Sequence, residues 1–239
     1  EVGQGRYLGG VSRPLVIAHR GASGYEVENS LAAFRAAAKL GADAVELDIH
    51  ETADGAIVVH HGNMVAGRHI NQCALWELRG HLLPNGEPIP MLEEALNVIL
   101  PHLMAYVETK TISPENDERL CDIIDDSPAP PRVALHAFDH RIIQRFAARR
   151  PHTRRGIISA SYPVNPVRCM ADADAQILWE EWPFIDEALV QSVHGAGMTI
   201  YAWTVNNREQ MDRLIRLGVD GLVSDMPDVA RRAIDSHPW

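Results

Sequence analysis

The sequence predicts a single α/β domain folded as a (β/α)8 TIM barrel, with a short insertion after the second strand. Three observations support this prediction. The chain has 239 residues, close to the roughly 250 that such a barrel usually needs. Short apolar runs alternate with helix-like segments, which is typical of parallel strands with helices outside. Polar residues follow several of these runs, and active sites in such barrels lie at the carboxyl ends of the strands.

The first strand and helix are clearly marked. An apolar run at residues 15–19 predicts the first strand. A helix-like segment follows, with Ser30 as its N-cap and Gly41 as its stop. Residues 44–49 form the next apolar run and predict the second strand. This order of strand, helix and strand is the first repeat of the barrel pattern.

An extra strand and an irregular region come next. Residues 57–60 follow the turn Asp54-Gly55 and predict a short additional strand. Residues 62–90 are rich in proline and lack sustained periodicity, so we interpret them as an inserted loop region. Because no low-complexity linker interrupts the chain, we expect one domain over residues 1–239.

The rest of the chain repeats the alternation to its end. Pro114 suits the first turn of a helix, and Asn206 or Asn207 caps a helix that stops at Gly218. The expected strands include residues 105–107, 133–138, 156–159, 176–179, 198–205 and 221–224. The other expected helices are residues 92–100, 114–126, 142–150, 166–173, 185–194 and 227–234. Eight such units in this length favour a closed barrel over an open sheet.

The composition excludes some classes of protein. The chain has 22 basic and 32 acidic residues, a net charge of −10, so we expect no nucleic-acid partner, because such binding depends on Lys and Arg. The three cysteines, Cys73, Cys121 and Cys169, are too scattered for a disulfide framework or a thiolate zinc site. The longest nearly uncharged stretch, residues 96–107, is shorter than the ~18 residues of a membrane span.

The sequence does not decide the cellular compartment or the oligomeric state of the protein. The chain begins at Glu1 rather than methionine, so we expect an upstream segment to have been removed. A cytoplasmic domain and a tethered extracytoplasmic one both fit, and the sequence does not fix the oligomeric state. Arginines between residues 145 and 155 suit a solvated helix end, so membrane contact is left open but is not indicated.

Carboxylates lie within the second expected strand and directly after the third. Glu46 and Asp48 are two residues apart, so they share one face of a strand and lie about 6.6 Å apart along it. Glu108 and Lys110 repeat this spacing with a carboxylate and an amine. Inward-facing carboxylates are costly unless they are paired or bound to a metal. The pattern therefore predicts a site for a hard cation such as Mg²⁺ or Ca²⁺, with an ion pair to Arg20 or Lys110 as the alternative.

Histidines and fixed positive charges complete the candidate site. His19 and Arg20 end the first strand, and His60 and His61 end the extra strand. Histidine titrates near neutral pH and serves as general acid or base. Arg20, together with the lysine that follows the third strand, supplies the positive charge that a phosphoryl group requires.

These motifs, in this order, resemble the glycerophosphodiester phosphodiesterase family. The resemblance begins with Ala18-His19-Arg20-Gly21 and continues through Glu46-Leu47-Asp48 and Glu108-Thr109-Lys110. Further matching segments are residues 28–30, 41–45, 52–55, 58–61, 203–206, 218–221 and 224–227. The resemblance covers essentially the whole chain and implies the same TIM barrel with a small insertion.

The resemblance also implies a chemistry for the strand ends. His19 and His61 correspond to the general acid and base of the family, and the family spacing selects His61 rather than His60. Glu46, Asp48 and Glu108 correspond to the ligands of one divalent cation, Mg²⁺ or Ca²⁺.

Substrate contacts follow from the same resemblance. Arg20 and Lys110 correspond to phosphate contacts, and Trp203 corresponds to an aromatic residue near the substrate. Phe138 is expected to line the same mouth. Glu28 occupies the place of a loop carboxylate that either orients Arg20 or begins a helix.

The chain departs from the family pattern in the loops. It has Val27 and Ser30 where Pro and Thr are common, and Gly62 where an Asp usually follows the catalytic His. Residues 67–70 also differ from the usual Arg-Thr-Thr-like stretch. These positions fall outside the expected metal ligands, so they bear on substrate choice.

The leading hypothesis is therefore a metal-dependent hydrolase that cleaves a small glycerophosphodiester to glycerol 3-phosphate and an alcohol. One alternative is a lysophospholipase D-like enzyme, which needs an apolar approach that residues 62–90 do not clearly provide. The other is a barrel that binds phosphodiesters without turnover. The nucleophile is either water or a neighbouring hydroxyl of the substrate, which would give a cyclic phosphate.

Overall fold

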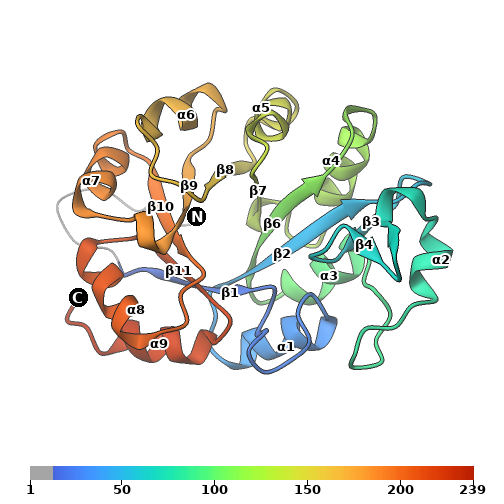
Figure 1. Cartoon of the computed structure of the whole chain (residues 1–239), viewed down its shortest axis with the longest axis horizontal. Helices are drawn as coiled ribbons and strands as arrows, with labels where there is room; N and C mark the ends of the chain where they lie inside the picture. Colours follow the sequence, from blue (N-terminus) through green and yellow to red (C-terminus); the bar gives the residue numbers. More distant parts are fainter. Residues whose placement is uncertain (1–12) are drawn as a thin grey trace.

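A computed structural model describes residues 13–239, and in this part of the chain the sheet is a closed barrel (Figure 1). The parallel barrel strands are β1 (Leu15–His19), β2 (Ala44–Glu51), β6 (Met104–Thr111), β7 (Val133–Ala137), β8 (Arg154–Ser159), β9 (Ile177–Glu181), β10 (Thr199–Trp203) and β11 (Gly221–Ser224). Each strand pairs with its neighbours in this order, and β1 pairs with both β11 and β2, which closes the ring. The predicted TIM barrel is therefore confirmed. Residues 1–12 of the expected 1–239 domain lie outside the described residues.

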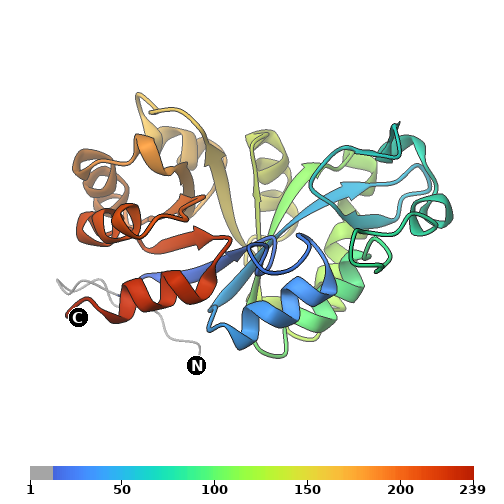
Figure 2. The ribbon, with the colours of Figure 1, turned by 60° about the horizontal axis from the view of Figure 1, so that its bottom comes forward.

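Helices lie around the outside of this ring (Figures 1 and 2). They are α1 (Leu31–Lys39), α3 (Leu92–Ile99), α4 (Asp117–Asp125), α5 (His140–Arg149), α6 (Pro166–Asp172), α7 (Glu187–Gly195), α8 (Arg208–Leu217) and α9 (Pro227–Asp235). Ser30 caps α1 by accepting from the backbone N–H of Ala33, as expected. Asn207, rather than Asn206, caps α8, and Gly218 ends it with a φ of 88°.

Apolar side chains fill two layers. The larger core lies between the strands and the outer helices. A second cluster fills the inside of the barrel and includes Ile17, Tyr106, Trp179 and Tyr201. The hydroxyls of Tyr106 and Tyr201 are 2.9 Å apart across the barrel. Because this layer fills the interior, the barrel is a packed core, and a binding site can open only at the ends of the strands.

The extra strand and the inserted region form a small lobe beside the barrel (Figure 1). Strand β3 (Ile57–Val59) pairs antiparallel with β2, so the predicted strand is confirmed and ends one residue earlier. The inserted region contains the hairpin β4 (Met64–Val65) and β5 (Arg68–His69) and the short helix α2 (Leu75–Arg79). A separate apolar cluster of Val58, Ile70, Cys73, Leu78 and Ile89 holds this lobe together.

Single turns of 3-10 helix occur at η1 (Ile70–Gln72), η2 (Pro114–Asn116), η3 (Pro130–Arg132) and η4 (Trp182–Phe184). Among residues 13–239, no helix combines the length and apolar character needed to cross a membrane. The cysteines at positions 73, 121 and 169 are all free thiols.

Arginines on α5 face acidic side chains of α4. Arg145 and Arg149 contact the buried Asp117 at 2.9 and 3.3 Å. Arg150, just after α5, contacts Glu118 and Asp125. Since this basic run is largely paired within the protein, its charge is balanced locally.

Candidate active site

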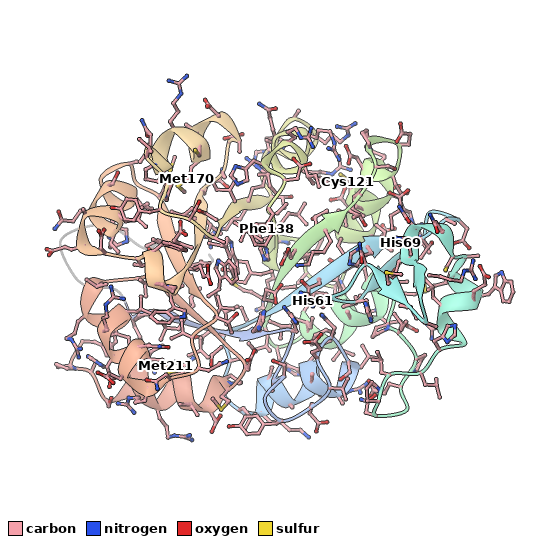
Figure 3. All side chains as sticks on the ribbon, in the orientation of Figure 1. His61, His69, Cys121, Phe138, Met170 and Met211 are labelled. Atoms are coloured by element: carbon pink, nitrogen blue, oxygen red, sulfur yellow. The ribbon has the colours of Figure 1, made fainter. Side chains whose placement is uncertain are left out.

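The carboxyl ends of the barrel strands surround one cavity of about 240 Å³. Every barrel strand contributes to its lining, and Figure 3 labels two of the lining side chains, His61 and Phe138. The lining residues are His19, Arg20, Glu46, His61, Glu108, Lys110, His136, Phe138, Ile158, Trp179, Trp203 and Val223. Most of the residues predicted from the sequence therefore meet at one place. Asp48 and Glu28 are not part of the lining, but Asp48 contacts Arg20 and Lys110, and Glu28 contacts Arg20.

His19 is held by a carboxylate from the far end of the chain. It ends β1, and its Nδ1 lies 2.7 Å from Oδ1 of Asp225, which follows β11. Ser23 and Asn206 also donate hydrogen bonds to Asp225, at 3.0 and 2.5 Å. Burial alone would raise the pKa of Asp225, but the hydrogen bonds from His19, Asn206 and Ser23 lower it to about 2. A carboxylate at Nδ1 leaves Nε2 of His19 as the atom available for chemistry.

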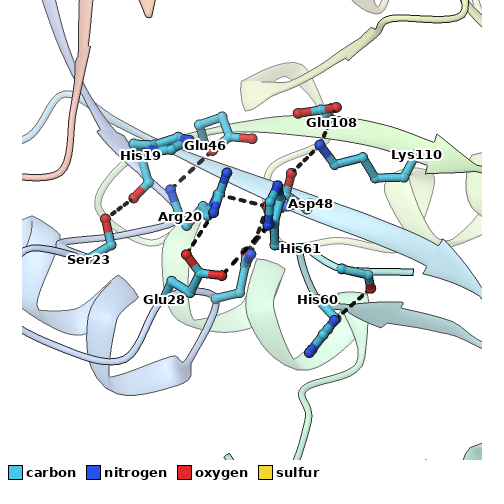
Figure 4. A network of polar contacts seen from close by, with 12 residues as sticks. His19, Arg20, Ser23, Glu28, Glu46, Asp48, His60, His61, Glu108 and Lys110 are labelled. Carbon is cyan, nitrogen blue, oxygen red and sulfur yellow. Dashed lines mark hydrogen bonds and ion pairs between the residues drawn. The ribbon is translucent and has the colours of Figure 1, made fainter. Parts of the chain in front are cut away.

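A strained turn positions Arg20. Its φ is 54°, in the left-handed region that non-glycine residues rarely adopt. The backbone N–H of Arg20 donates to Glu46 at 3.1 Å, and its carbonyl accepts from Asn29, which also has a positive φ of 56°. Its guanidinium donates to Glu28 at 2.7 Å and lies 3.2 Å from Asp48 (Figure 4). Glu28 thus contacts Arg20, the residue that it was expected either to orient or to leave for a helix start.

Asp48 lies below the cavity between the two cations. Its side chain is 1% exposed, and Lys110 Nζ is 3.0 Å from its Oδ1 (Figure 4). Asn29 Nδ2 donates to its other oxygen at 2.8 Å. Burial opposes ionisation of Asp48, but Lys110 and Arg20 outweigh it and lower the pKa of the carboxyl below its ordinary value. The ion pair considered as the alternative for these carboxylates is therefore present at Asp48.

Glu46 and Glu108 face a histidine that the sequence analysis did not select. One ligand atom from each of Glu46, Glu108 and His136 lies within 4.8 Å of the other two. Lys110 Nζ is 2.5 Å from Glu108 Oε1. Burial, followed by the charges of Asp48 and Glu108, raises the pKa of Glu46 well above its ordinary value, and burial raises that of Glu108 to about 7. Buried oxygen donors that repel one another in this way fit a divalent cation.

The two histidines after the extra strand point differently. His61 lines the cavity, and its Nδ1 is 3.9 Å from Glu28. Nδ1 of His60 instead lies 2.7 Å from the Gly62 carbonyl, as Figure 4 shows. Nε2 of the buried His50 lies 3.3 Å from the His61 carbonyl. Burial, together with Arg20, lowers the pKa of His61. Glu28 thus supplies a carboxylate near His61, where Gly62 offers none.

Aromatic side chains form the opposite wall. Phe138, just after β7, and Trp203, at the end of β10, meet edge to face with ring centroids 5.8 Å apart. Lys110 Nζ lies 5.9 Å from the Phe138 ring centroid. Both aromatic residues therefore lie at the mouth, as predicted. The sequence does not single out Trp179, in the middle of β9, or Asp225, directly after β11, as site residues.

A barrel that gathers imidazoles, carboxylates and two fixed cations in one cavity is suited to hydrolysing a phosphate ester. The sequence model of the "Glycerophosphoryl diester phosphodiesterase family" matches residues 19–229. The chain belongs to this family and is a phosphoric diester hydrolase.

Individual relatives agree. The chain is 31% identical over 233 residues to a glycerophosphodiester phosphodiesterase of Caldanaerobacter subterraneus subsp. tengcongensis, covering 90% of this chain and 96% of the relative. It is similar to the solved glycerophosphodiester phosphodiesterase of Parabacteroides distasonis (TM-score 0.87, 25% identity, 95% of this chain and 99% of that one). It is also similar to an Oleispira antarctica phosphodiesterase solved with the product sn-glycerol-3-phosphate (TM-score 0.86, 27% identity, 93% and 97% coverage).

Proposed function

We propose that the enzyme is a divalent-metal-dependent hydrolase that cleaves small glycerophosphodiesters to sn-glycerol 3-phosphate and a free alcohol, with His19 and His61 as its acid–base pair. The observation that carries this proposal is the single cavity lined by both imidazoles, both cations and two buried carboxylates. The relative solved with sn-glycerol-3-phosphate supports the choice of product.

Arg20 and Lys110 bind the phosphate group. Both line the cavity and both are held by Asp48, at 3.2 and 3.0 Å. This shared buried anion fixes the two cations before substrate arrives. Positive charge that is already in place stabilises the negative charge on the phosphoryl oxygens in the transition state without reorganisation.

His19 and His61 move the protons. Asp225 holds Nδ1 of His19, so Nε2 accepts a proton from the nucleophile and the aspartate stabilises the resulting imidazolium. His61 donates a proton to the leaving oxygen of the alcohol. The nucleophile is either water or the neighbouring glycerol hydroxyl, and a cyclic phosphate product distinguishes the second route from the first.

Glu46, Asp48 and Glu108 are the proposed ligands of one Mg²⁺ or Ca²⁺. The donor set fits, because oxygen ligands suit these ions. Two of the three carboxylates, Glu46 and Glu108, line the cavity. Burial raises the pKa of both. An ion held by these carboxylates would supply positive charge to the phosphoryl oxygens and would lower the pKa of the nucleophile. Phe138 and Trp203 contact the organic part of the substrate.

The test is a product assay with purified protein. Glycerophosphocholine, glycerophosphoethanolamine, glycerophosphoinositol and a lysophospholipid are each supplied with Mg²⁺, Ca²⁺ or chelator, and phosphorus NMR follows the products. We expect glycerol 3-phosphate from the glycerophosphodiesters, and loss of turnover with chelator. Preference for the lysophospholipid would favour an enzyme that uses the exposed Met64, Trp76 and Leu82 of the inserted region. Absence of turnover with every substrate would favour a binding protein.

A further inference from the structure

His136 is a buried imidazole that the proposed mechanism does not use. It stands on β7, is 2% exposed and lines the cavity. Its Nδ1 has no hydrogen-bond partner among residues 13–239. Its Nε2 lies 3.8 Å from Glu46 Oε1, which is beyond hydrogen-bond distance. Leaving a buried polar ring without hydrogen bonds is costly, so its position requires an explanation.

The ring is fixed by packing. His136 stacks on Trp179 with ring centroids 4.0 Å apart and planes 6° from parallel. The indole in turn occupies space that only glycine leaves free, because a Cβ on Gly156 would lie 2.6 Å from Trp179 Nε1. Packing thus holds a ring nitrogen of His136 toward the carboxylates of Glu46 and Glu108.

The spacing fits two ligands of one ion. For ligand distances of about 2.1 Å, two ligand atoms on one ion are about 3.0 Å apart when adjacent and about 4.2 Å apart when opposite. The 3.8 Å between His136 Nε2 and Glu46 Oε1 lies inside that range, and the nearest ligand atom of Glu108 completes a group within 4.8 Å. A histidine that only packed in the core would not need its nitrogen close to the oxygens of two carboxylates.

We propose that Nε2 of His136 is a further ligand of the divalent ion and gives the site a preference for a first-row transition ion such as Mn²⁺ over Ca²⁺. The inference rests on the proposed metal site of Glu46 and Glu108. Imidazole nitrogen suits transition ions, whereas Ca²⁺ takes oxygen ligands almost entirely. The nitrogen therefore raises affinity for Mn²⁺ and leaves affinity for Ca²⁺ nearly unchanged.

The test measures metal binding by spectroscopy and calorimetry. It uses the full chain after a chelator has removed any bound metal. Mn²⁺ is titrated by electron paramagnetic resonance, Ca²⁺ by calorimetry, and pulsed measurements detect nitrogen coupled to the bound Mn²⁺. His136→Phe keeps a ring against Trp179 but has no nitrogen, and His136→Gln removes the ring but keeps polar atoms. His19→Asn is the control for the other imidazole that lines the cavity near Glu46.

We expect nitrogen coupling in the wild type and in His19→Asn, and loss of it in both His136 variants. Affinity for Mn²⁺ should fall about tenfold or more in these variants, with Ca²⁺ affinity changed by less than about twofold. Coupling that persists in both His136 variants, or disappears only in His19→Asn, overturns the inference. A third outcome would overturn the role of His136 alone. In it, the wild type binds Mn²⁺ without nitrogen coupling, and Glu46→Gln no longer binds Mn²⁺. Failure of every divalent ion to bind the wild type overturns the metal-dependent function as well.

Discussion

The two halves of the barrel mouth differ sharply in chemistry. Strands β1, β2 and β6 carry nearly all of the charge, in the side chains of His19, Arg20, Glu46, Asp48, Glu108 and Lys110. Strands β7 to β11 contribute mainly apolar rings and aliphatic groups, namely Phe138, Ile158, Trp179, Trp203 and Val223, and the imidazole of His136 on β7 is the exception. The proposed function assigns the reaction on the phosphate to the first half and the space for the organic groups to the second.

The apolar half also strengthens the electrostatic interactions of the charged half. The rings of Phe138 and Trp203 pack edge to face and line one side of the cavity with apolar surface. Interactions between charges are stronger where less water surrounds them. Lys110 stands at the boundary, since it contacts Asp48 and Glu108 on one side and lies 5.9 Å from the Phe138 ring on the other. Substitutions on the two halves should therefore produce different kinetic signatures.

The largest effect is expected at His61. His61→Ala should lower kcat about a thousandfold, because a positioned general acid contributes about 10²–10⁴ to the rate. His60→Ala is the matched control, since His60 lies outside the cavity lining and contacts the Gly62 carbonyl; its kcat should stay within about threefold of the wild type. Steady-state hydrolysis of glycerophosphocholine measures both. A reversal of the two results would show that the acid is the other histidine.

The next largest effect is expected at Lys110. Lys110→Met keeps the length of the side chain but removes the charge, and kcat/KM should fall about 10²–10³-fold because one fixed charge on the phosphoryl oxygens is lost. The other lysine, Lys39, lies at the end of α1 away from the cavity lining. Lys39→Met should leave kcat/KM unchanged, and equal losses in the two variants would argue against a role for Lys110 in the site.

A smaller loss is expected at Asp225. Asp225→Asn keeps the shape of the side chain but removes the anion that faces Nδ1 of His19 at 2.7 Å. We expect kcat to fall about 10²-fold with little change in KM, because the imidazolium loses its stabilising charge. The pH profile of kcat should also shift, and an unchanged profile together with unchanged kcat would leave Asp225 a structural residue only.

A substitution on the aromatic half of the mouth should change KM rather than kcat. Trp203→Leu removes the ring that packs against Phe138, and KM should rise about tenfold while kcat changes little, because an apolar contact of about 1–1.5 kcal/mol is lost. Initial rates over a range of glycerophosphocholine concentrations separate the two constants. A fall in kcat without a rise in KM would mean that the division between the two halves is wrong.

The smallest effect concerns acid stability. The pKa of Asp225 is lowered from 3.8 to about 2 in the folded protein, so its stabilising contribution is present above pH ~4 and is lost as the pH falls toward 2. Its side chain is 31% exposed, and with solvent screening the contribution is about 1 kcal/mol. Urea unfolding at pH 6 and pH 3 should show a smaller pH dependence in Asp225→Asn than in the wild type.

The fold was largely predictable because its strands are buried on both faces. Buried parallel strands are continuous apolar runs, and residues 15–19 and 221–224 were predicted with the bounds that β1 and β11 have. The small elements of the inserted region were not predicted. Strands β4 and β5 are two residues long, too short to produce a periodic pattern.

The site was predictable only where local spacing defines it. Glu46 and Glu108 follow from alternation along a strand, and the same rule, applied to His136 and Phe138, would have found the missed histidine. Asp225 could not be placed by local spacing, because it is 206 residues from His19 and meets it only when β1 and β11 pair. The spacing of Asp48 in its strand does not reveal that Arg20 and Lys110 both contact its carboxylate.

The central claim is that phosphate binds the charged half of the mouth and the organic group faces the aromatic half. A crystal structure of the protein with sn-glycerol 3-phosphate tests it most directly. We expect the phosphate against Arg20 and Lys110, between His19 and His61, with the glycerol carbons toward Trp203. A phosphate bound outside this cavity, or one that faces Trp203 while the carbons lie against Lys110, would contradict the account.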